Sequence, residues 1–308
     1  MGTIIQLKVY GKNADKATEK ALKRISDIES KMSVNIETSE ISKLNGKSGV
    51  SGEKLSSDTY SVIKKAVQYS KLTEGALDIT IEPIVKLWGI GTEKERVPTK
   101  NEILEKLKLV NYKDILLDEK NSTVQLRRTG QAIDLGAIAK GYTADEVKKI
   151  LLENNISSAL INLGGNVFAV GSKPDGTSWN IGIQNPLDTR GQYIGTISVT
   201  DKSVVTSGNY ERYFIVDGKR YHHIFDTKTG YPSEAGLIST TIVSDKSIDG
   251  DALSTSTYIM GLAKGIKLIE SIKGVEAIFI TQDKKIYVTS GLKDSINIIS
   301  KEFTYEER

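Results

Sequence analysis

Two residues one helical turn apart are the first candidates for chemistry in this sequence. In the segment 251–255, the Asp251 carboxylate and the Thr255 hydroxyl stand at positions i and i+4, so they would share one face of a helix. Oxygen donors at this spacing suit a hard cation, with water and phosphate oxygens completing its shell. The simpler alternative is that Asp249 and Asp251 begin the helix as capping residues.

A second candidate combines a carboxylate and a lysine in the segment 134–141. Asp134 comes before a predicted helix and Lys140 lies one turn inside it, so backbone N–H groups and an ammonium group could face a phosphate. An Asp cap followed by a solvated lysine is the alternative. Three further segments place glycines beside polar residues, at 162–166, 206–210 and 223–230. A turn with positive φ explains any one of them, but their number favours a binding site.

The only two histidines, His222 and His223, are adjacent in the predicted strand 220–225. Side chains alternate along a strand, so at most one of the two rings can face a given cleft. A histidine with a pKa near 6.5 can act as a general base at neutral pH, but an isolated histidine is more often a hydrogen-bonded surface residue.

Composition narrows the chemistry further. The chain has no cysteine among 308 residues, which excludes disulfides, thiolate nucleophiles, zinc-thiolate sites and iron-sulfur clusters. Lys+Arg 42 and Asp+Glu 39 give a net charge of +3 without blocks of like charge, so nothing indicates a nucleic-acid groove. No apolar run is long enough for a transmembrane segment. The usual phosphate-loop, dinucleotide and hydrolase motifs are absent.

Hydrophobic spacing predicts the elements that must position these residues. Helices are predicted over 14–32, 57–72, 134–154 and 251–272, the last interrupted near Gly261. Pro83 predicts a turn or short irregular helix in 79–88, and 94–100 is predicted to be a charged loop. Strands are predicted over 3–10, 159–163, 179–184, 193–199, 213–216, 220–225, 239–244, 276–281 and 285–289, with a hairpin at Asp217-Gly218. We therefore predict an α+β fold of two intimately packed mixed α/β lobes divided near residue 130.

The order of the motifs resembles the ApbE family of FAD:protein FMN transferases along almost the whole chain. The resemblance is carried by 1–3, 39–45, 73–80, 87–89, the four glycine-containing segments and 251–255. It implies a T-fold-related architecture and a single catalytic unit over 1–308, with lobes of about 1–130 and 131–308 and the active site in the cleft between them. It also implies a Mg²⁺-dependent enzyme that splits FAD at the pyrophosphate, releases AMP and attaches FMN through a phosphoester to a threonine of an acceptor protein.

The resemblance also implies roles for individual residues. The Ala137 carbonyl, Asp251 and Thr255 correspond to the magnesium ligands, and His223 and Asn45 to catalytic positions. The FAD contacts correspond to Met1, Asn35, Ala76, Leu77, Asp78, Asp134, Lys140 and Phe225. Ser254 stands where some members have a second Asp, which implies one more water on the metal. Asn35 replaces an aromatic residue of some relatives, so stacking is not expected there.

Two other functions stay open at this point: an FAD-binding protein without turnover, and an FAD pyrophosphatase that gives free FMN and AMP. No segment resembles the family's flavin-attachment motif, so the acceptor is expected to be a different protein. The resemblance further implies an extracytoplasmic location at the bacterial cell membrane, with a leader and a lipid anchor in the full-length precursor.

Overall fold

The protein is described by a computed structural model covering residues 2–189 and 191–306, which fall into two compact units. The first unit takes its residues from Met1–Ile25, Lys140–Tyr210 and Ala235–Arg308, and the second from Ser26–Ala139 and Glu211–Glu234. Met1, a predicted FAD contact, lies outside the described residues.

The division of the chain differs from the single boundary expected near residue 130. The chain passes between the units four times, and only the passage at 139/140 is close to that boundary. The segment 211–234 belongs to the second unit, where Phe225 packs with Trp88 in one core cluster. Such long-range packing leaves no local pattern, because periodicity shows what an element is and not which core it joins.

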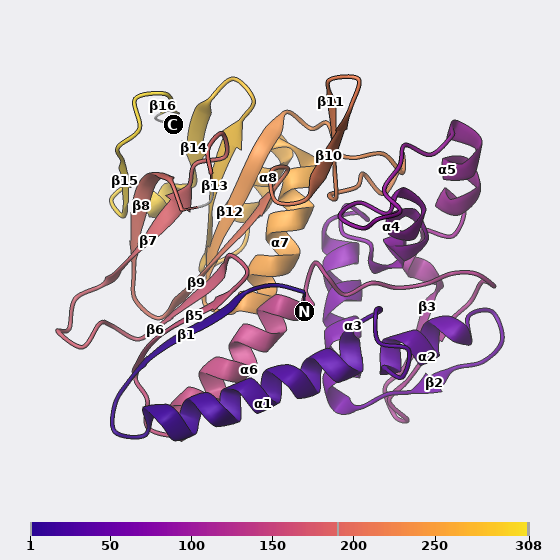
Figure 1. Ribbon diagram of the computed structural model, residues 1–308, viewed down its shortest axis with the longest axis horizontal. Helices are drawn as coiled ribbons and strands as arrows, with labels where there is room; N and C mark the ends of the chain where they lie inside the picture. The colour runs from indigo at the N-terminus through magenta and orange to yellow at the C-terminus, as the bar shows by residue number, and fades with distance from the viewer. Residues whose placement is uncertain (1, 190, 307–308) are drawn as a thin grey trace. The chain divides into compact units, whose positions relative to one another are not determined.

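The first unit is built on a large mixed sheet (Figure 1). Among the described residues, its strands follow the order β1-β5-β6-β9-β12-β13-β14-β16, and only β14 and β16 pair in parallel. Their bounds are Ile5–Tyr10, Ser158–Leu163, Asn166–Val170, Lys202–Gly208, Leu237–Ser244, Val275–Thr281, Lys285–Val288 and Thr304–Glu306. A second sheet has the order β15-β8-β7, with bounds Ile296–Ile298, Tyr193–Val199 and Trp179–Gln184.

Alternation along the strands serves a separate core on each face of the large sheet. On one face, Ile161 of β5 joins a cluster with Ala21 of α1 (Ala14–Met32) and Val147 of α6 (Ala139–Glu153). On the other, Ala169 of β6 joins a cluster with residues of β7 and β8. Helices α7 (Ser247–Met260) and α8 (Leu262–Glu270) follow β12, and α7 lies against β9 and β12.

The second unit is built mainly from short helices, with bounds α2 Glu40–Gly46, α3 Ser57–Leu72, η1 Ile79–Ile81, α4 Glu82–Trp88, α5 Lys100–Leu107 and η2 Tyr112–Asp114. A small sheet has the order β2-β4-β3, with bounds Glu53–Lys54, Thr123–Leu126 and Ile115–Asp118. Strands β10 (Tyr213–Val216) and β11 (Lys219–His222) form the predicted hairpin, and Asp217 and Gly218 have φ of 51° and 75°, as a type I′ turn requires. No helix within residues 2–189 and 191–306 is long and apolar enough to cross a membrane.

The predicted helices 14–32 and 57–72 have the bounds of α1 and α3. Three other elements begin or end at residues that differ from the prediction, and these differences affect the position of candidate site residues. Helix α6 begins at Ala139 and not at Asp134, helix α7 begins before Asp251, and strand β11 ends at His222 and not at Phe225. The first two differences place Lys140 and Asp251 in new positions on their helices, and the third leaves His223 outside any strand.

Candidate active site

The first group of predicted site residues surrounds the Asp251 carboxylate in the first unit. Helix α7 begins at Ser247, four residues earlier, so Asp251 cannot be its N-cap. Asp251 is 4% exposed, its Oδ2 accepts a hydrogen bond from the Gly141 N–H at 2.7 Å, and its Oδ1 lies 3.5 Å from Lys140 Nζ. The capping alternative is therefore wrong for Asp251, and Lys140 is paired with a buried carboxylate.

Two neighbours make this geometry possible. A Cβ on Gly141 would lie 2.2 Å from the Ser247 carbonyl oxygen, so only glycine allows the start of α6 to approach the first turn of α7 this closely. Asp145 of α6 accepts hydrogen bonds from the N–H groups of Ser247 at 2.7 Å and Ile248 at 3.0 Å. It supplies the cap that Lys246, at the N-cap, lacks. Burial raises the pKa of Asp145 to about 6.

Thr255 follows Asp251 by one turn, and its hydroxyl lies 3.1 Å from the Ser207 hydroxyl. Ser207 is also 2.8 Å from the Ser254 hydroxyl. Ser207 belongs to the glycine-containing segment 206–210 at the end of β9. Hydroxyl oxygens thus gather one turn beyond the buried carboxylate, as the i, i+4 spacing predicts.

A third glycine-containing segment reaches the same helix. Asn166, at the end of 162–166, is buried, and its Oδ1 accepts a hydrogen bond from the Ser247 hydroxyl at 2.7 Å. Residues 140–141, 162–166 and 206–210 therefore all contact α7, although they are far apart in the sequence. Their convergence supports the interpretation that they are more than isolated turns.

Asp78 organises the second group, which lies in the second unit. It is 6% exposed, its Oδ1 accepts from the Thr80 N–H at 2.8 Å and the Thr80 hydroxyl at 2.6 Å, and its Oδ2 accepts from the Tyr112 N–H at 2.8 Å. Burial raises the pKa of Asp78 above its ordinary value. The neighbouring Ala76 and Leu77 are also buried. These protein donors engage both carboxylate oxygens, so the side chain of Asp78 holds its own loop together.

Hydrogen bonds join the Asp78 loop to two other predicted segments. The Thr227 hydroxyl, from segment 223–230, donates to the Gly75 carbonyl at 2.6 Å. The Asp134 N–H donates to the Ile79 carbonyl at 2.8 Å. Within this unit the chain therefore brings residues 75–79, residue 134 and residues 223–230 together.

The Asn45 side chain fixes the backbone just before Asp134. Its Nδ2 donates to the Ile133 carbonyl at 3.0 Å and its Oδ1 accepts from the Ile133 N–H at 2.8 Å. These two bonds make Asn45 a positioning residue for the segment that carries Asp134. Asn35, by contrast, is exposed in a turn after α1, where its N–H donates to Ser33 Oγ.

Glu82, at the start of α4, is a neighbour of Asp134 that the sequence did not predict as a site residue. The Glu82 side chain is 2% exposed and its Oε1 lies 3.3 Å from Lys86 Nζ. Burial, together with the charge of Asp134, raises the pKa of Glu82 to about 7. The available signal was an acidic residue next to Pro83 in an otherwise apolar stretch. Ala137 is half-buried in the turn before α6.

His222 is a structural residue. It is 5% exposed, its Nε2 donates to the Ser233 carbonyl at 3.1 Å, and its Nδ1 accepts from the Ile224 N–H at 3.3 Å. Burial lowers the pKa of His222 to about 4, so the ring is neutral at pH 7. The ring of His222 therefore connects the backbone at Ile224 with the backbone at Ser233, and it does not change protonation state near pH 7.

His223 differs from its neighbour because β11 has already ended. It is half-buried, and its Nδ1 lies 3.2 Å from the Arg212 carbonyl, which also accepts from the His223 N–H. A carbonyl can only accept, so Nδ1 carries the proton and a neutral ring has its lone pair on Nε2. The two rings thus have different environments: His222 is buried against the Ser233 carbonyl, and His223 is half-buried against the Arg212 carbonyl.

Phe225 is buried beside the tryptophan of α4. Its ring centroid lies 5.9 Å from that of Trp88, and Tyr221 lies 5.4 Å from Trp88 on the hairpin side. Trp88 Nε1 donates to the Gly230 carbonyl at 2.9 Å. This aromatic cluster anchors both ends of the segment that contains His223.

Comparison with known proteins identifies the family. The ApbE family model matches residues 1–279. The chain belongs to the ApbE family. Relatives include the FAD:protein FMN transferase of Treponema pallidum strain Nichols, at 34% identity with 99% of this chain and 89% of the relative covered. The FAD:protein FMN transferase of Klebsiella pneumoniae strain 342 is 37% identical, with 94% and 90% covered.

Solved ApbE structures confirm the α+β fold of the family. The ApbE protein of Thermotoga maritima MSB8 superimposes with a TM-score of 0.88 at 34% identity, over 96% of each chain. The flavin transferase ApbE of Vibrio cholerae gives a TM-score of 0.83 at 27% identity, also over 96% of each chain. The predicted ApbE resemblance is therefore confirmed, and the residues described above can be interpreted in the frame of this family.

Proposed function

We propose that this ApbE-family protein is an FAD:protein FMN transferase, which cleaves FAD at its pyrophosphate, releases AMP and attaches FMN through a phosphoester to a threonine of an acceptor protein. The observation that carries the proposal is the buried Asp251 carboxylate 3.5 Å from the Lys140 ammonium, with the Thr255 hydroxyl one turn further along the helix. Phosphoryl transfer depends on groups that position and neutralise the phosphate oxygens. The activity that the names of its relatives state supports the same reaction.

Asp251, Thr255 and the Ala137 carbonyl are the proposed ligands of Mg²⁺. All three donors are oxygen atoms, which this ion prefers. Among the described residues, no three His, Asp or Glu side chains gather as a metal cage, and an ion that also binds substrate phosphates can use one protein carboxylate. The ion, when bound, neutralises charge on the pyrophosphate. Ser254, in place of a second Asp, leaves room for one more water.

His223 is the proposed base. The acceptor threonine Oγ attacks the phosphorus of the FMN half, the bond from that phosphorus to the bridging oxygen breaks, and AMP leaves with that oxygen. The threonine proton passes to Nε2 of His223, because Nδ1 already donates to the Arg212 carbonyl. General base catalysis of this kind contributes roughly 10²–10⁴-fold. Asn45 contributes by holding the backbone before Asp134.

The test is incubation of the purified protein with FAD, MgCl₂ and a candidate acceptor, followed by intact mass of the acceptor and assay of AMP. An FMN adduct with one AMP per adduct is expected, and chelation of Mg²⁺ should abolish it. An acceptor whose target threonine is replaced by valine is the matched control. AMP with free FMN would make the protein a pyrophosphatase, and FAD binding without AMP would make it a flavin carrier.

The location of the protein is a separate proposal. The resemblance to the ApbE family supports a lipid-anchored precursor that acts on the outer face of the cytoplasmic membrane. Fractionation of the native cells tests it, because the protein should sediment with membranes and be accessible to protease in spheroplasts. Recovery in the cytosolic fraction would contradict the proposal.

A further inference from the structure

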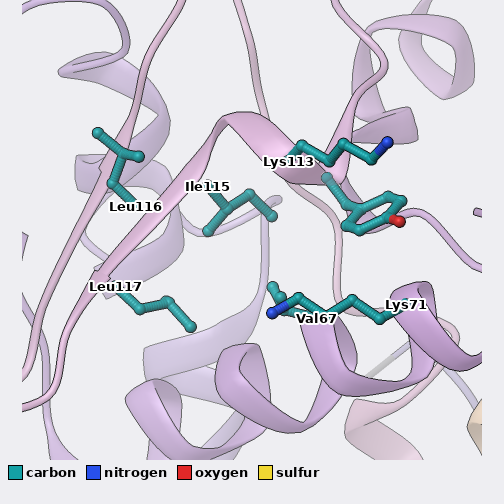
Figure 2. A pocket seen from close by; sticks show the side chains of 7 residues that line it. Val67, Lys71, Lys113, Ile115, Leu116 and Leu117 are labelled. Atoms are coloured by element: carbon teal, nitrogen blue, oxygen red, sulfur yellow. The ribbon is translucent and has the colours of Figure 1, made fainter.

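A hollow in the second unit lies beside an open sheet edge (Figure 2). Strand β3 is the last strand of the sheet β2-β4-β3, so its outer edge pairs with no strand among the described residues. A hollow of about 410 Å³, here called the β3 hollow, opens between β3 and α3. This volume lies within the roughly 300–1,000 Å³ of ordinary ligand sites.

The β3 hollow has an apolar floor and a basic rim. Val67 of α3 and Ile115 and Leu117 of β3 line the floor, and Figure 2 shows Ile115 and Leu117 directed toward the helix. Lys71 and Lys113 line the rim and are both exposed. No acidic side chain is among the described residues that line the hollow. Its chemistry therefore complements a ligand that is apolar and negatively charged.

We propose that the β3 edge and its hollow bind an extended, acidic and apolar segment of the acceptor protein, an inference that rests on the proposed transferase function. An added strand would form main-chain hydrogen bonds with the edge and place alternate side chains in the hollow. Its carboxylates would pair with Lys71 and Lys113. A second copy of this chain at the same edge would instead bring like charges together, which is unfavourable.

Tyr112 connects this surface with the loop that carries Asp78. It lines the β3 hollow, and its N–H donates to Asp78 Oδ2 at 2.8 Å. Its ring lies 3.5 Å from the position that a Cβ on Gly75 would take. Tyr112 therefore contacts both the hollow and the loop 75–78, so a segment bound there would hold the acceptor close to the proposed flavin contacts.

The test is the double variant Lys71→Glu/Lys113→Glu in a steady-state assay of adduct formation. The KM for the acceptor should rise about tenfold at low salt, and by less at high salt because exposed charge pairs are screened. The kcat, the affinity for FAD and any AMP release without acceptor should stay within about twofold, because neither lysine belongs to the proposed catalytic groups. The control Lys43→Glu/Lys106→Glu changes two other exposed lysines of the same unit by the same total charge.

A second variant, Leu117→Arg, fills the hollow while adding positive charge, so a rise in acceptor KM there would show that the cavity itself is used. An unchanged KM in both variants, or an equal rise in the control pair, would overturn the docking site while leaving transfer intact. The docking site would also be overturned if the double variant lost dimer formation, or lost binding to phosphatidylglycerol vesicles, while its acceptor KM stayed unchanged. A wild-type protein that forms no adduct would overturn the transferase function itself.

Discussion

Two buried aspartates, one in each unit, show that burial does not by itself identify a functional carboxylate. Asp251 is 4% exposed and Asp78 is 6% exposed, so both have lost almost all contact with water. Both also belong to segments that the sequence predicts to bind substrate or metal. What separates them is the chemistry of their partners.

The Asp251 carboxylate accepts a hydrogen bond from one backbone N–H and pairs with one cation. Its two oxygens meet the Gly141 N–H and the Lys140 ammonium. The oxygens of Asp78, by contrast, accept two hydrogen bonds from Thr80 and one from the Tyr112 N–H. A carboxylate saturated by neutral donors holds a loop, whereas one that shares its charge with a partly exposed lysine can exchange that partner for a metal ion or phosphate-bound water.

The largest expected effect is that of Asp251→Asn. This change keeps the size of the side chain and an oxygen for the Gly141 N–H, but removes the charge. Transfer should fall by about 10²–10³-fold, as when one electrostatic group is removed from a transition-state site. The free energy of unfolding should fall by about 1–3 kcal/mol, because the change removes the charged partner of Lys140 at a buried site. Adduct formation and urea denaturation measure the two quantities.

The matched control is Asp201→Asn in the same unit. Asp201 pairs with Lys148 at 3.0 Å but is half-exposed and has no proposed role in the reaction. The Asp201→Asn variant should retain the transfer activity within about twofold, and its stability should change little because exposed ion pairs contribute little to stability. If Asp251→Asn behaved like Asp201→Asn, the contrast between Asp251 and Asp78 would have no functional meaning.

The next largest expected effect is that of Glu82 on the pH dependence of the free energy of unfolding. Burial raises its pKa from 4.5 to about 7 in the folded chain, so folding favours the protonated form. The stabilisation is complete below pH 4.5 and is lost as the pH rises through 7. Relative to Glu82→Gln, the wild type should therefore lose about 3 kcal/mol of unfolding free energy over this range.

Urea denaturation of both proteins at pH 5 and pH 8 measures this loss. Asp134→Asn should reduce it, because the charge of Asp134 contributes to the raised pKa of Glu82. Parallel pH profiles for the wild type and Glu82→Gln would show that folding does not raise the pKa of Glu82.

Thr80, beside Asp78, and Thr255, beside Asp251, provide a second test of the difference between the two aspartates. The buried Thr80 hydroxyl donates to Asp78 and accepts from the Asn111 N–H at 2.7 Å. Thr80→Val leaves the Asn111 N–H without its acceptor and removes one of the two Thr80 bonds to Asp78 Oδ1, so it should cost about 2 kcal/mol. Thr255→Val removes a hydroxyl bonded to Ser207 beside Asp251. It should lower transfer more than it lowers stability. Denaturation and adduct formation of the two isosteric variants check this, and the reverse pattern would contradict the assignment of the two regions.

The sequence predicts elements well where their ends are set by local chemistry. The bounds of α3 are predicted because Ser56 caps the helix and an apolar face runs along it. The capping box of Thr99 and Glu102 was an equally local signal for α5, but no helix was predicted there; the predicted charged loop 94–100 ends where α5 begins. The start of α7 could not be predicted, because Asp145 of another helix supplies its cap.

The candidate site shows the same limit. The resemblance predicts which residue types matter, but the partners that give them their properties come from distant parts of the chain. The contact of Gly141 with Asp251 and the pairing of Asn45 with Ile133 both span about a hundred residues of sequence. The raised pKa of Glu82 depends on burial, which a single charged residue in a short helix does not reveal.

The smallest expected effects concern the two histidines. Like Asp78, His222 has a structural role, and like Asp251, His223 has a proposed role in the reaction. Both nitrogens of His222 are bonded to backbone, so His222→Ala should destabilise the fold by about 2 kcal/mol and leave transfer per folded molecule nearly unchanged. The depressed pKa of His222, about 4, means that its contribution is present above pH 6.5 and is lost as the pH falls toward 4.

His223→Ala should lower transfer more than it lowers stability, because His223 Nε2 is the proposed proton acceptor while Nδ1 donates to the Arg212 carbonyl. Transfer should fall at least about tenfold while FAD affinity changes by no more than a few fold, the pattern of an interaction made mainly in the transition state. FAD fluorescence titration, adduct mass and urea denaturation of both variants separate the two roles. Equal losses of transfer in the two variants, or a loss of FAD binding alone in His223→Ala, would remove His223 from the mechanism and leave the Asp251 region as the main source of rate.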